Sequence, residues 1–150
     1  MKFSESLKSN SDFRRVYRGG KSYANKYLVM YVLENGTDKN RLGISVSKKV
    51  GNSVVRHRIT RLVRESYRLH ENIFNSGLDI VVVARVGAKE VGYAEIESAL
   101  LHVSKLHRIL IIHGLFQLPA LPHTAARVVG VAHDGSMDLP PPRSTDGARR

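Results

Sequence analysis

The chain has 150 residues, with 24 Lys and Arg against 13 Asp and Glu, and so a formal net charge of +11 at pH 7. A chain of about 100–150 residues makes one ordinary domain, and a positive excess of this size predicts a polyanionic partner. No run of about 18 residues is both apolar and uncharged, so we expect no membrane span, and Met1–Asn10 lacks the apolar segment of a secretory signal. Without cysteine there is no disulfide, no cysteine-based zinc site and no thiol nucleophile. Together these exclusions predict a soluble, cytoplasmic protein.

The composition changes near Leu110. All five prolines lie beyond it, and no Lys or Glu follows Lys105. Residues 1–110 contain 20 Lys and Arg and 10 Asp and Glu, whereas residues 111–150 contain 4 Arg and 3 Asp. We therefore predict one domain over residues 1–110 and interpret residues 111–150 as a non-native or disordered extension. A genuine interaction tail is the alternative.

The apolar residues of the domain repeat with helical and strand periods. Phe13, Val16 and Tyr17 have the i, i+3, i+4 spacing of a short amphipathic helix, and the aliphatic run from Ile80 to Ala84 is typical of a strand covered on both faces. The pattern predicts the order αβββαβα, with a very short first strand, and therefore a βαβ crossover in an α+β sandwich. The predicted bounds are 10–18, 53–70 and 93–110 for the helices and 27–33, 42–47 and 78–85 for the three longer strands.

The long helix has an unusual charge pattern. From Arg41 to Arg68 the chain holds eight Lys and Arg and a single acid, Glu65. The apolar face of the helix consists of Val55, Ile59, Leu62, Val63 and Ser66, and the opposite face is a basic stripe of His57, Arg61, Arg64 and Arg68, flanked by Arg56 and Arg58. Like charges at i, i+4 cost a helix roughly 0.2–0.5 kcal/mol per pair. The pattern therefore indicates a surface that a phosphate backbone neutralises, with an ordinary solvated face as the alternative.

A second anion-binding element precedes this helix. The segment from Lys48 to Ser53 contains two lysines and Gly51, which lets a ligand approach the backbone, and the free N–H groups at a helix start attract anions. The spacing is not that of a Walker-type phosphate loop. An ordinary turn before a helix is the alternative.

Aromatic side chains close to these cations predict a cleft for single-stranded RNA. Phe13 and Tyr17 lie on one side of the first helix, and Tyr31 lies on a neighbouring strand. Stacking of a base on an aromatic ring is worth about 1–3 kcal/mol and demands little sequence specificity. Core packing is the alternative for the two residues of the helix. The strand that would face them offers only small side chains on one side, namely Gly43, Ser45 and Ser47.

The chain shows no arrangement typical of an active site for RNA hydrolysis. Such a site needs clustered carboxylates for metal ions or a histidine pair for acid–base catalysis. Glu95 and Glu97 are two residues apart on a helix and face different directions, and His102 and His107 are misaligned for shared metal binding. An ordinary core or surface position explains His102 and His107 better than a metal site does. His57 lies among arginines, whose positive charge makes a poor environment for a metal ion. We therefore expect no catalytic residue and no bound metal or cofactor in this chain.

Three segments resemble one known family. The segment from Arg41 to Glu65, RLGISVSKKVGNSVVRHRITRLVRE, resembles the signature of the bacterial ribonuclease P protein subunit. Phe13–Tyr17 (FRRVY) and Asp79–Arg85 (DIVVVAR) resemble that family's first helix and last strand. The resemblance covers roughly residues 3–110 and implies an αβββαβα two-layer sandwich with a left-handed βαβ crossover, of the type found in ribosomal proteins.

The resemblance also implies a function. The protein would bind the catalytic RNA of ribonuclease P and the 5′ leader of precursor tRNA, while the RNA and its Mg²⁺ ions remove the leader. By position the resemblance carries over Arg56 and Arg58, and together with the basic stripe we expect catalytic-RNA binding by Arg56, His57, Arg58, Arg61, Arg64 and Arg68. The resemblance assigns leader binding to Phe13, Tyr17, Tyr31, Lys48 and Lys49 by position, and we add Ser47 from the small-residue face of the neighbouring strand.

One position departs from the family. The family's helix usually reads Arg-Asn-Arg, whereas this chain reads Arg56-His57-Arg58. His57 keeps a planar group that donates or accepts a hydrogen bond, but it does not reproduce an amide.

Two other functions stay open at this point, a ribosomal or general RNA-binding protein and a protein-only nuclease.

Overall fold

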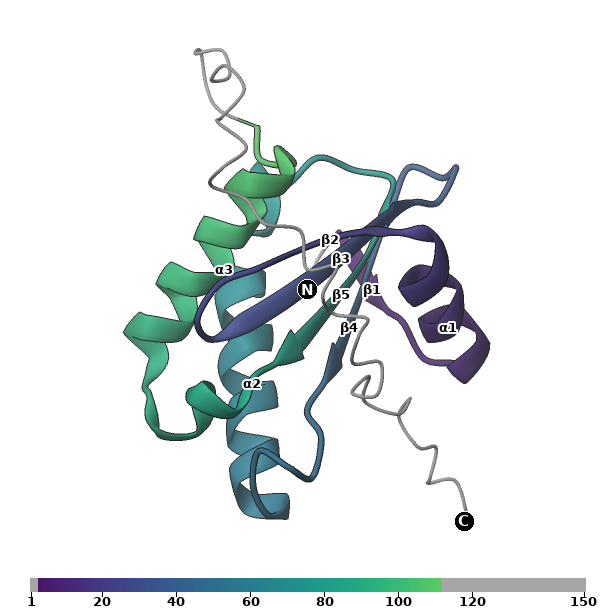
Figure 1. Cartoon of the computed structure of the whole chain (residues 1–150). Helices are drawn as coiled ribbons and strands as arrows, with labels where there is room; N and C mark the ends of the chain where they lie inside the picture. Colours follow the sequence, from purple (N-terminus) through teal and green to yellow (C-terminus); the bar gives the residue numbers. More distant parts are fainter. Residues whose placement is uncertain (1–2, 112–150) are drawn as a thin grey trace.

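The structure of the chain, a computed structural model, describes residues 3–111. It contains one five-stranded sheet, three α-helices and two short 3₁₀ helices (Figure 1). In chain order the elements are β1 (Ser4–Ser6), α1 (Asn10–Gly19), β2 (Lys21–Ala24), β3 (Leu28–Glu34), β4 (Asn40–Ser45), α2 (Ser53–Leu69), η1 (Glu71–Ile73), β5 (Leu78–Ala84), η2 (Val86–Glu90) and α3 (Tyr93–His107).

The sheet has the strand order β1-β4-β5-β3-β2. β4 runs parallel to β1 and β5, whereas β3 runs antiparallel to β5 and β2. β5 is the central strand, and Ile80, Val81 and Val82 have no exposed surface. The aliphatic run therefore forms a strand that is covered on both faces from Ile80 to Val82, as its composition predicted, whereas Val83 is half-buried.

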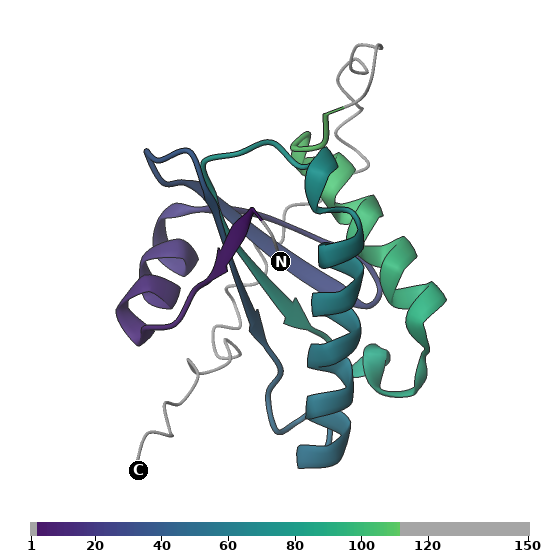
Figure 2. The same cartoon turned by 180° about the vertical axis from the view of Figure 1, so that it is seen from behind.

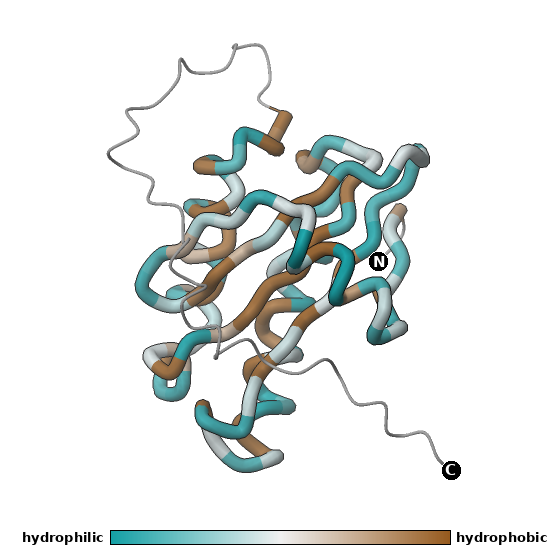
Figure 3. The backbone as a smooth tube through the Cα atoms, turned by 45° about the vertical axis from the view of Figure 1, so that its right-hand side comes forward, coloured by the Kyte–Doolittle hydropathy of each residue, from teal (hydrophilic) through white to brown (hydrophobic). Residues whose placement is uncertain are grey.

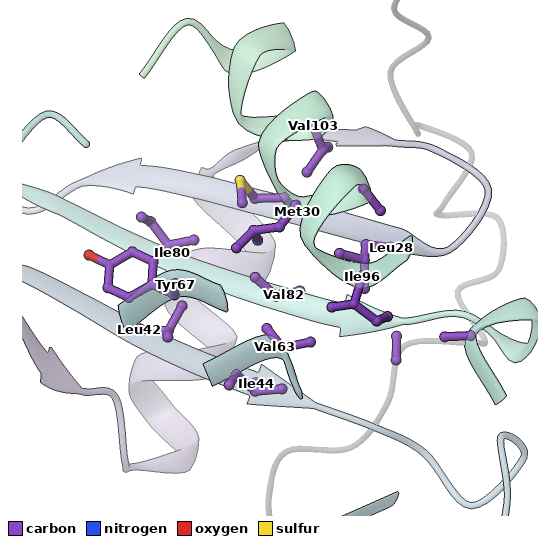
Figure 4. Close-up of a cluster of buried hydrophobic side chains, with 14 of the residues drawn as sticks. Leu28, Met30, Leu42, Ile44, Val63, Tyr67, Ile80, Val82, Ile96 and Val103 are labelled. Carbon is purple, nitrogen blue, oxygen red and sulfur yellow. The ribbon is translucent and has the colours of Figure 1, made fainter. Parts of the chain in front are cut away.

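The helices cover the two faces of the sheet unequally. α2 and α3 lie together on one face, and α1 lies alone on the other (Figures 1 and 2). The main core fills the space between the sheet and the α2–α3 layer, where Val63 of α2 and Ile96 and Val103 of α3 are completely buried (Figure 4). Hydrophobic colour accordingly concentrates along the central strands and fades toward the loops (Figure 3). Because α1 is short, it leaves part of its face of the sheet less covered.

The crossover between the two central parallel strands is left-handed. β4 leads into α2, and α2 returns to β5, which pairs with β4 in the register Arg41↔Asp79 to Ser45↔Val83. Seen from the side of α2 with β4 pointing upward, β5 lies to the left of β4 (Figures 1 and 2). Most such connections are right-handed, so the handedness agrees with the family resemblance and not with the general rule. The predicted α+β fold class is confirmed.

Some predicted boundaries differ from the structure. β1 was not predicted, because Ser4–Ser6 is polar and has no apolar alternation. β4 begins and ends two residues earlier than predicted, and α3 ends at His107 because Arg108 adopts a left-handed backbone conformation with φ 63°. The predicted extension covers residues 111–150, and all of it beyond residue 111 lies outside the described residues. The predicted domain boundary at residue 110 therefore stays a prediction.

Candidate nucleic-acid interface

Helix α2 presents the predicted basic stripe to solvent. Its first turn is capped by the Asn52 side chain, which accepts a hydrogen bond from the Val55 amide at 3.0 Å. The buried side of the helix consists of Ile59, Val63, Ser66 and Tyr67, which face the core. All four stripe residues, His57, Arg61, Arg64 and Arg68, lie on the exposed side.

The stripe residues differ in how they are paired. Arg68 donates to Glu65 from Nε at 3.1 Å and from Nη2 at 2.6 Å. This hydrogen bond lowers the pKa of Glu65 and raises the pKa of Arg68. Within residues 3–111, His57, Arg61 and Arg64 make no side-chain hydrogen bond or ion pair. These three residues therefore form the part of the stripe that is open to an external anion.

The two flanking arginines hold backbone carbonyls of neighbouring loops. Arg56 donates from Nη1 to the Gly51 carbonyl at 3.0 Å. Arg58 donates to the carbonyls of Lys89 at 2.6 Å and Val91 at 3.0 Å, and so joins the start of α2 to the loop before α3. A guanidinium has five N–H donors, so each arginine keeps donors for a second partner while its position is set by the loop.

The loop from β4 to α2 carries the lysine pair. Lys48 and Lys49 are exposed, and Ser47 is half-buried. The loop turns through a hydrogen bond from the Val50 amide to the Ser47 carbonyl at 3.0 Å and one from the Lys49 amide to Ser47 Oγ at 3.2 Å. A Cβ at Gly51 would lie 2.8 Å from Cγ1 of Val55, so this close approach favours glycine. The lysines therefore lie between the end of β4 and the basic helix.

On the other face of the sheet, α1 forms a smaller apolar cluster. Ser9 caps the helix by accepting from the Asp12 amide at 3.1 Å, and Phe13 and Val16 are buried against the sheet. Tyr31 of β3 and Val81 of β5 lie in the same cluster. The predicted aromatic residues of the helix and the strand are therefore brought together.

Phe13 is part of the core and is not an open stacking surface. Only 1% of its surface is exposed. A Cβ at Gly43 would lie 2.6 Å from Cζ of the Phe13 ring, so the ring lies directly against the β4 backbone. This burial favours the core-packing alternative for Phe13, and the contact of Phe13 with a leader stays a prediction. Phe13 supports Tyr17, whose ring centroid is 6.3 Å away.

Tyr17 is the accessible aromatic residue of this cluster. Its ring meets Tyr31 edge-on, with 5.0 Å between centroids and an interplanar angle of 75°. Tyr17 is half-buried, whereas Tyr31 is only 7% exposed, and its burial raises the pKa of the Tyr31 hydroxyl. Tyr31 therefore lies beneath Tyr17 in the cluster, and Tyr17 is the more accessible of the two rings.

Two residues beside this cluster were missed by the sequence analysis. Val29 and Val83 are register partners on β3 and β5, and both remain half-buried. They share the sheet face of Tyr31 because side chains two residues apart on a strand point the same way. The next strand continues this row with Ser45, the register partner of Val83, and leads to Ser47 and Lys48. Half-burial of valines in otherwise buried strands was not visible in the sequence pattern.

The histidines and glutamates of α3 have structural surroundings. His107 Nε2 lies 2.8 Å from the Met30 carbonyl, and burial lowers the pKa of His107 to about 4. His102 Nδ1 lies 3.1 Å from Asn25 Nδ2, which also donates to the Ala99 carbonyl at 2.9 Å. Glu95 caps its own helix at the Gly92 amide. In the part of the chain that the structure describes, no three His, Asp or Glu side chains come together as a metal site, and no helix is long and apolar enough to cross a membrane.

These features define a class of small α+β protein in which a basic crossover helix and an aromatic cluster lie on opposite faces of one sheet. The ribonuclease P family model matches residues 1–107. The ribonuclease P protein component of Lachnoclostridium phytofermentans is 68% identical over 107 residues, which cover 71% of this chain and 92% of that relative. The component of Alkaliphilus metalliredigens is 51% identical over 110 residues, which cover 73% and 99%.

Solved structures agree with the sequence relatives. The ribonuclease P protein of Staphylococcus aureus has a TM-score of 0.67 at 41% identity, over 71% of this chain and 98% of that one. The protein of Thermotoga maritima has a TM-score of 0.63 at 33% identity, over 67% and 96%. The chain belongs to the bacterial ribonuclease P protein component family. It is therefore the protein part of a ribonucleoprotein endonuclease of tRNA 5′ processing, with ribonuclease P RNA as its partner.

Proposed function

We propose that the two surfaces divide the work of the protein subunit. The stripe on α2 binds the phosphate backbone of the catalytic RNA, and the cleft beside Tyr17 holds the single-stranded 5′ leader of precursor tRNA. The Mg²⁺-dependent cleavage is carried out by the RNA. The protein's contribution is then to orient the leader relative to the RNA that cuts it, which is a binding task and requires no catalytic side chain.

The observation that carries this proposal is the unpaired charge of α2. Arg61 and Arg64 lie three residues apart on the exposed side of the helix and have no intramolecular partner within residues 3–111. Unneutralised neighbouring cations destabilise a helix, and their placement is favourable when phosphates neutralise them. A general solvated surface would be expected to intersperse acids, and here Glu65 is paired with Arg68.

The cleft has the features that a sequence-independent leader site requires. It combines an accessible aromatic ring at Tyr17, half-buried apolar side chains at Val29 and Val83, and two exposed lysines in the loop after β4. Base stacking together with backbone charge binds single strands without reading their sequence. A subunit that serves many precursors needs this kind of contact.

Reconstitution tests the proposal. Precursor tRNA is incubated with the protein alone, with a ribonuclease P catalytic RNA alone, and with both, over a Mg²⁺ series. We expect the protein alone to cleave nothing and the mixture to cleave at Mg²⁺ concentrations where the RNA alone is inactive. Cleavage by the protein alone would identify a protein-only nuclease. Binding without any gain in cleavage would identify a general RNA-binding protein.

A further inference from the structure

A buried carboxylate connects α1 to the sheet. Asp79, near the start of β5, has a completely buried side chain. Its Oδ1 accepts from Arg41 Nε at 2.9 Å and from Asn35 Nδ2 at 2.9 Å. Its Oδ2 accepts from Arg41 Nη2 at 2.8 Å and from Arg15 Nη2 at 2.9 Å. A buried charge is tolerated when it is paired and fully hydrogen-bonded in this way.

The four residues of this cluster come from four parts of the fold. Asp79 lies on β5, Arg41 is its register partner on β4, Asn35 follows β3, and Arg15 lies on α1. Arg15 is 64 residues from Asp79 in sequence. It is the residue through which α1 reaches this carboxylate, because the other donors belong to the sheet and its turn.

The cluster is electrically balanced and is therefore poorly suited to attract RNA. The two guanidinium groups of Arg15 and Arg41 face two carboxylates, those of Asp79 and Asp12, the latter accepting from both arginines at 3.4 Å. Burial alone would raise the pKa of Asp79, but the hydrogen bonds from Arg41, Asn35 and Arg15 lower it below its ordinary value. The carboxylate stays ionised at neutral pH, so no net positive charge is left for a phosphate.

The position of Arg15 on α1 determines what this contact can control. At 100° per residue, Arg15 and Tyr17 lie about 160° apart around the helix axis. Phe13 and Val16 pack against the sheet between these two flanks. The ion pairs that join the Arg15 flank to the sheet, Arg15–Asp79 and the longer Asp12–Arg41, act with the buried Phe13 ring to restrain the rotation of α1 about its axis. This rotation sets how the Tyr17 ring lies against Tyr31.

We propose that Asp79, acting through Arg15, is a positioning residue for leader binding. It holds α1 so that Tyr17 keeps its edge-on geometry with Tyr31 at the cleft, although neither Asp79 nor Arg15 touches the leader. This inference rests on the proposed leader site and adds a determinant of its geometry on the far side of α1.

The test uses two variants of α1 that remove the same charge. Arg15→Gln breaks the contact with Asp79 but leaves Asp79 bonded to Arg41 and Asn35, so the sheet keeps its buried pair. Arg18→Gln is the matched control, because Arg18 is exposed on the same helix and makes no side-chain hydrogen bond or ion pair in the described range. Holoenzyme is assembled with each variant, and its affinity for precursor and mature tRNA is measured over a salt series.

We expect Arg15→Gln to reduce the preference for precursor over mature tRNA by about threefold to tenfold, since small misplacement of a binding group is costly. The slope of log K against log salt should stay at the wild-type value, because a positioning residue releases no counterions. Arg18→Gln should leave the preference within about twofold of wild type, because the aromatic geometry that carries stacking is unchanged. Equal preferences in the two variants would overturn the inference. A salt slope reduced by about one in Arg15→Gln alone would also overturn it, because Arg15 would then contact a phosphate directly.

Hydrogen exchange of the α1 amides gives a second, independent measurement. It should be faster in Arg15→Gln than in Arg18→Gln at a temperature where both remain folded. Loss of precursor preference with unchanged exchange would contradict positioning. If wild-type holoenzyme itself shows no preference for precursor tRNA, the leader site is wrong. If wild type shows the preference and Arg15→Gln retains it, only the positioning inference fails.

Discussion

Two groups of arginines in this protein have opposite surroundings. On α2, Arg61 and Arg64 are exposed and have no partner within residues 3–111, whereas Arg15 and Arg41 are paired with the buried Asp79 on the other face of the sheet. The arginines of α2 therefore present positive charge to an external polyanion. The arginines around Asp79 donate their hydrogen bonds within the protein and so join α1 to the sheet. A high net charge therefore does not mark a binding surface by itself. The pairing of each cation decides which role it has.

The same distinction divides a single helix. Arg58 lies one turn or less from Arg61 on α2, yet it donates to two backbone carbonyls of the loop before α3. Arg68 is paired with Glu65. Loss of Arg58 is therefore expected to alter the loop as well as RNA binding, whereas loss of Arg61 removes charge alone.

The largest expected effect tests the paired group. Asp79→Ala leaves Arg15 and Arg41 without their buried partner, and breaking such a pair costs roughly 3–5 kcal/mol of the free energy of unfolding. Arg61→Ala, a matched charge change on an exposed helix, should stay within about 0.5 kcal/mol. Urea denaturation of both variants measures the difference. An ordinary hydrogen bond contributes about 1 kcal/mol to stability. If Asp79→Ala lowers the free energy of unfolding by less than this, the cluster contributes little to the stability of the fold.

Acid titration separates this cluster from the buried histidine. The folded-state pKa of His107 is about 4, below the ordinary value of about 6.5, so the unfolded chain binds this proton more tightly. The stability contributed by neutral His107 is present above pH ~6.5 and is lost as pH falls toward 4, by roughly 2–3 kcal/mol. The depressed pKa of Asp79 acts only below its ordinary value of about 3.9. His107→Gln should flatten the unfolding free energy between pH 6.5 and 4, and an unchanged slope would contradict the assignment.

The cleft gives the next largest effect. Tyr17→Ala should weaken precursor binding by the holoenzyme by roughly 1–3 kcal/mol, the worth of one stacked base, and leave mature tRNA binding almost unchanged. Phe13→Ala is no substitute, because removing this core ring costs about 3–5 kcal/mol of stability. Thermal melts must show that the Tyr17 variant is folded. If the Tyr17 variant loses affinity equally for precursor and mature tRNA, the leader does not bind beside Tyr17.

The smallest expected change in free energy belongs to the exposed arginines of α2, and it is best measured by the salt dependence of RNA binding. If four to six cations contact phosphates, log K for catalytic RNA should fall against log salt with a slope of about −3 to −5. Arg61→Ala with Arg64→Ala should reduce that slope by about 2 without affecting the melting temperature, because both side chains are exposed. A flat salt response in the wild type would contradict the distinction between unpaired and paired arginines, since the unpaired arginines of α2 would then bind no polyanion.

Much of the fold and of the interface was predictable from local patterns. The 3.6-residue period of α2 separated its buried side from its basic side, and the aliphatic run of β5 indicated a strand covered on both faces. These features depend on residues three or four positions apart, or on neighbours along one strand, so the sequence carries them directly.

Tertiary structure alone decided which side chains are available. It buried Phe13 against Gly43, left Val29 and Val83 half-covered, and added β1 beside β4. It also brought Arg15 to Asp79 across 64 residues. Such contacts join distant segments, and their formation depends on how helices pack on the sheet, which no periodicity encodes. The sequence by itself determined where charge and apolar surface lie along each element. Only the packing of those elements determined which charges are neutralised within the protein and which remain exposed to an external partner.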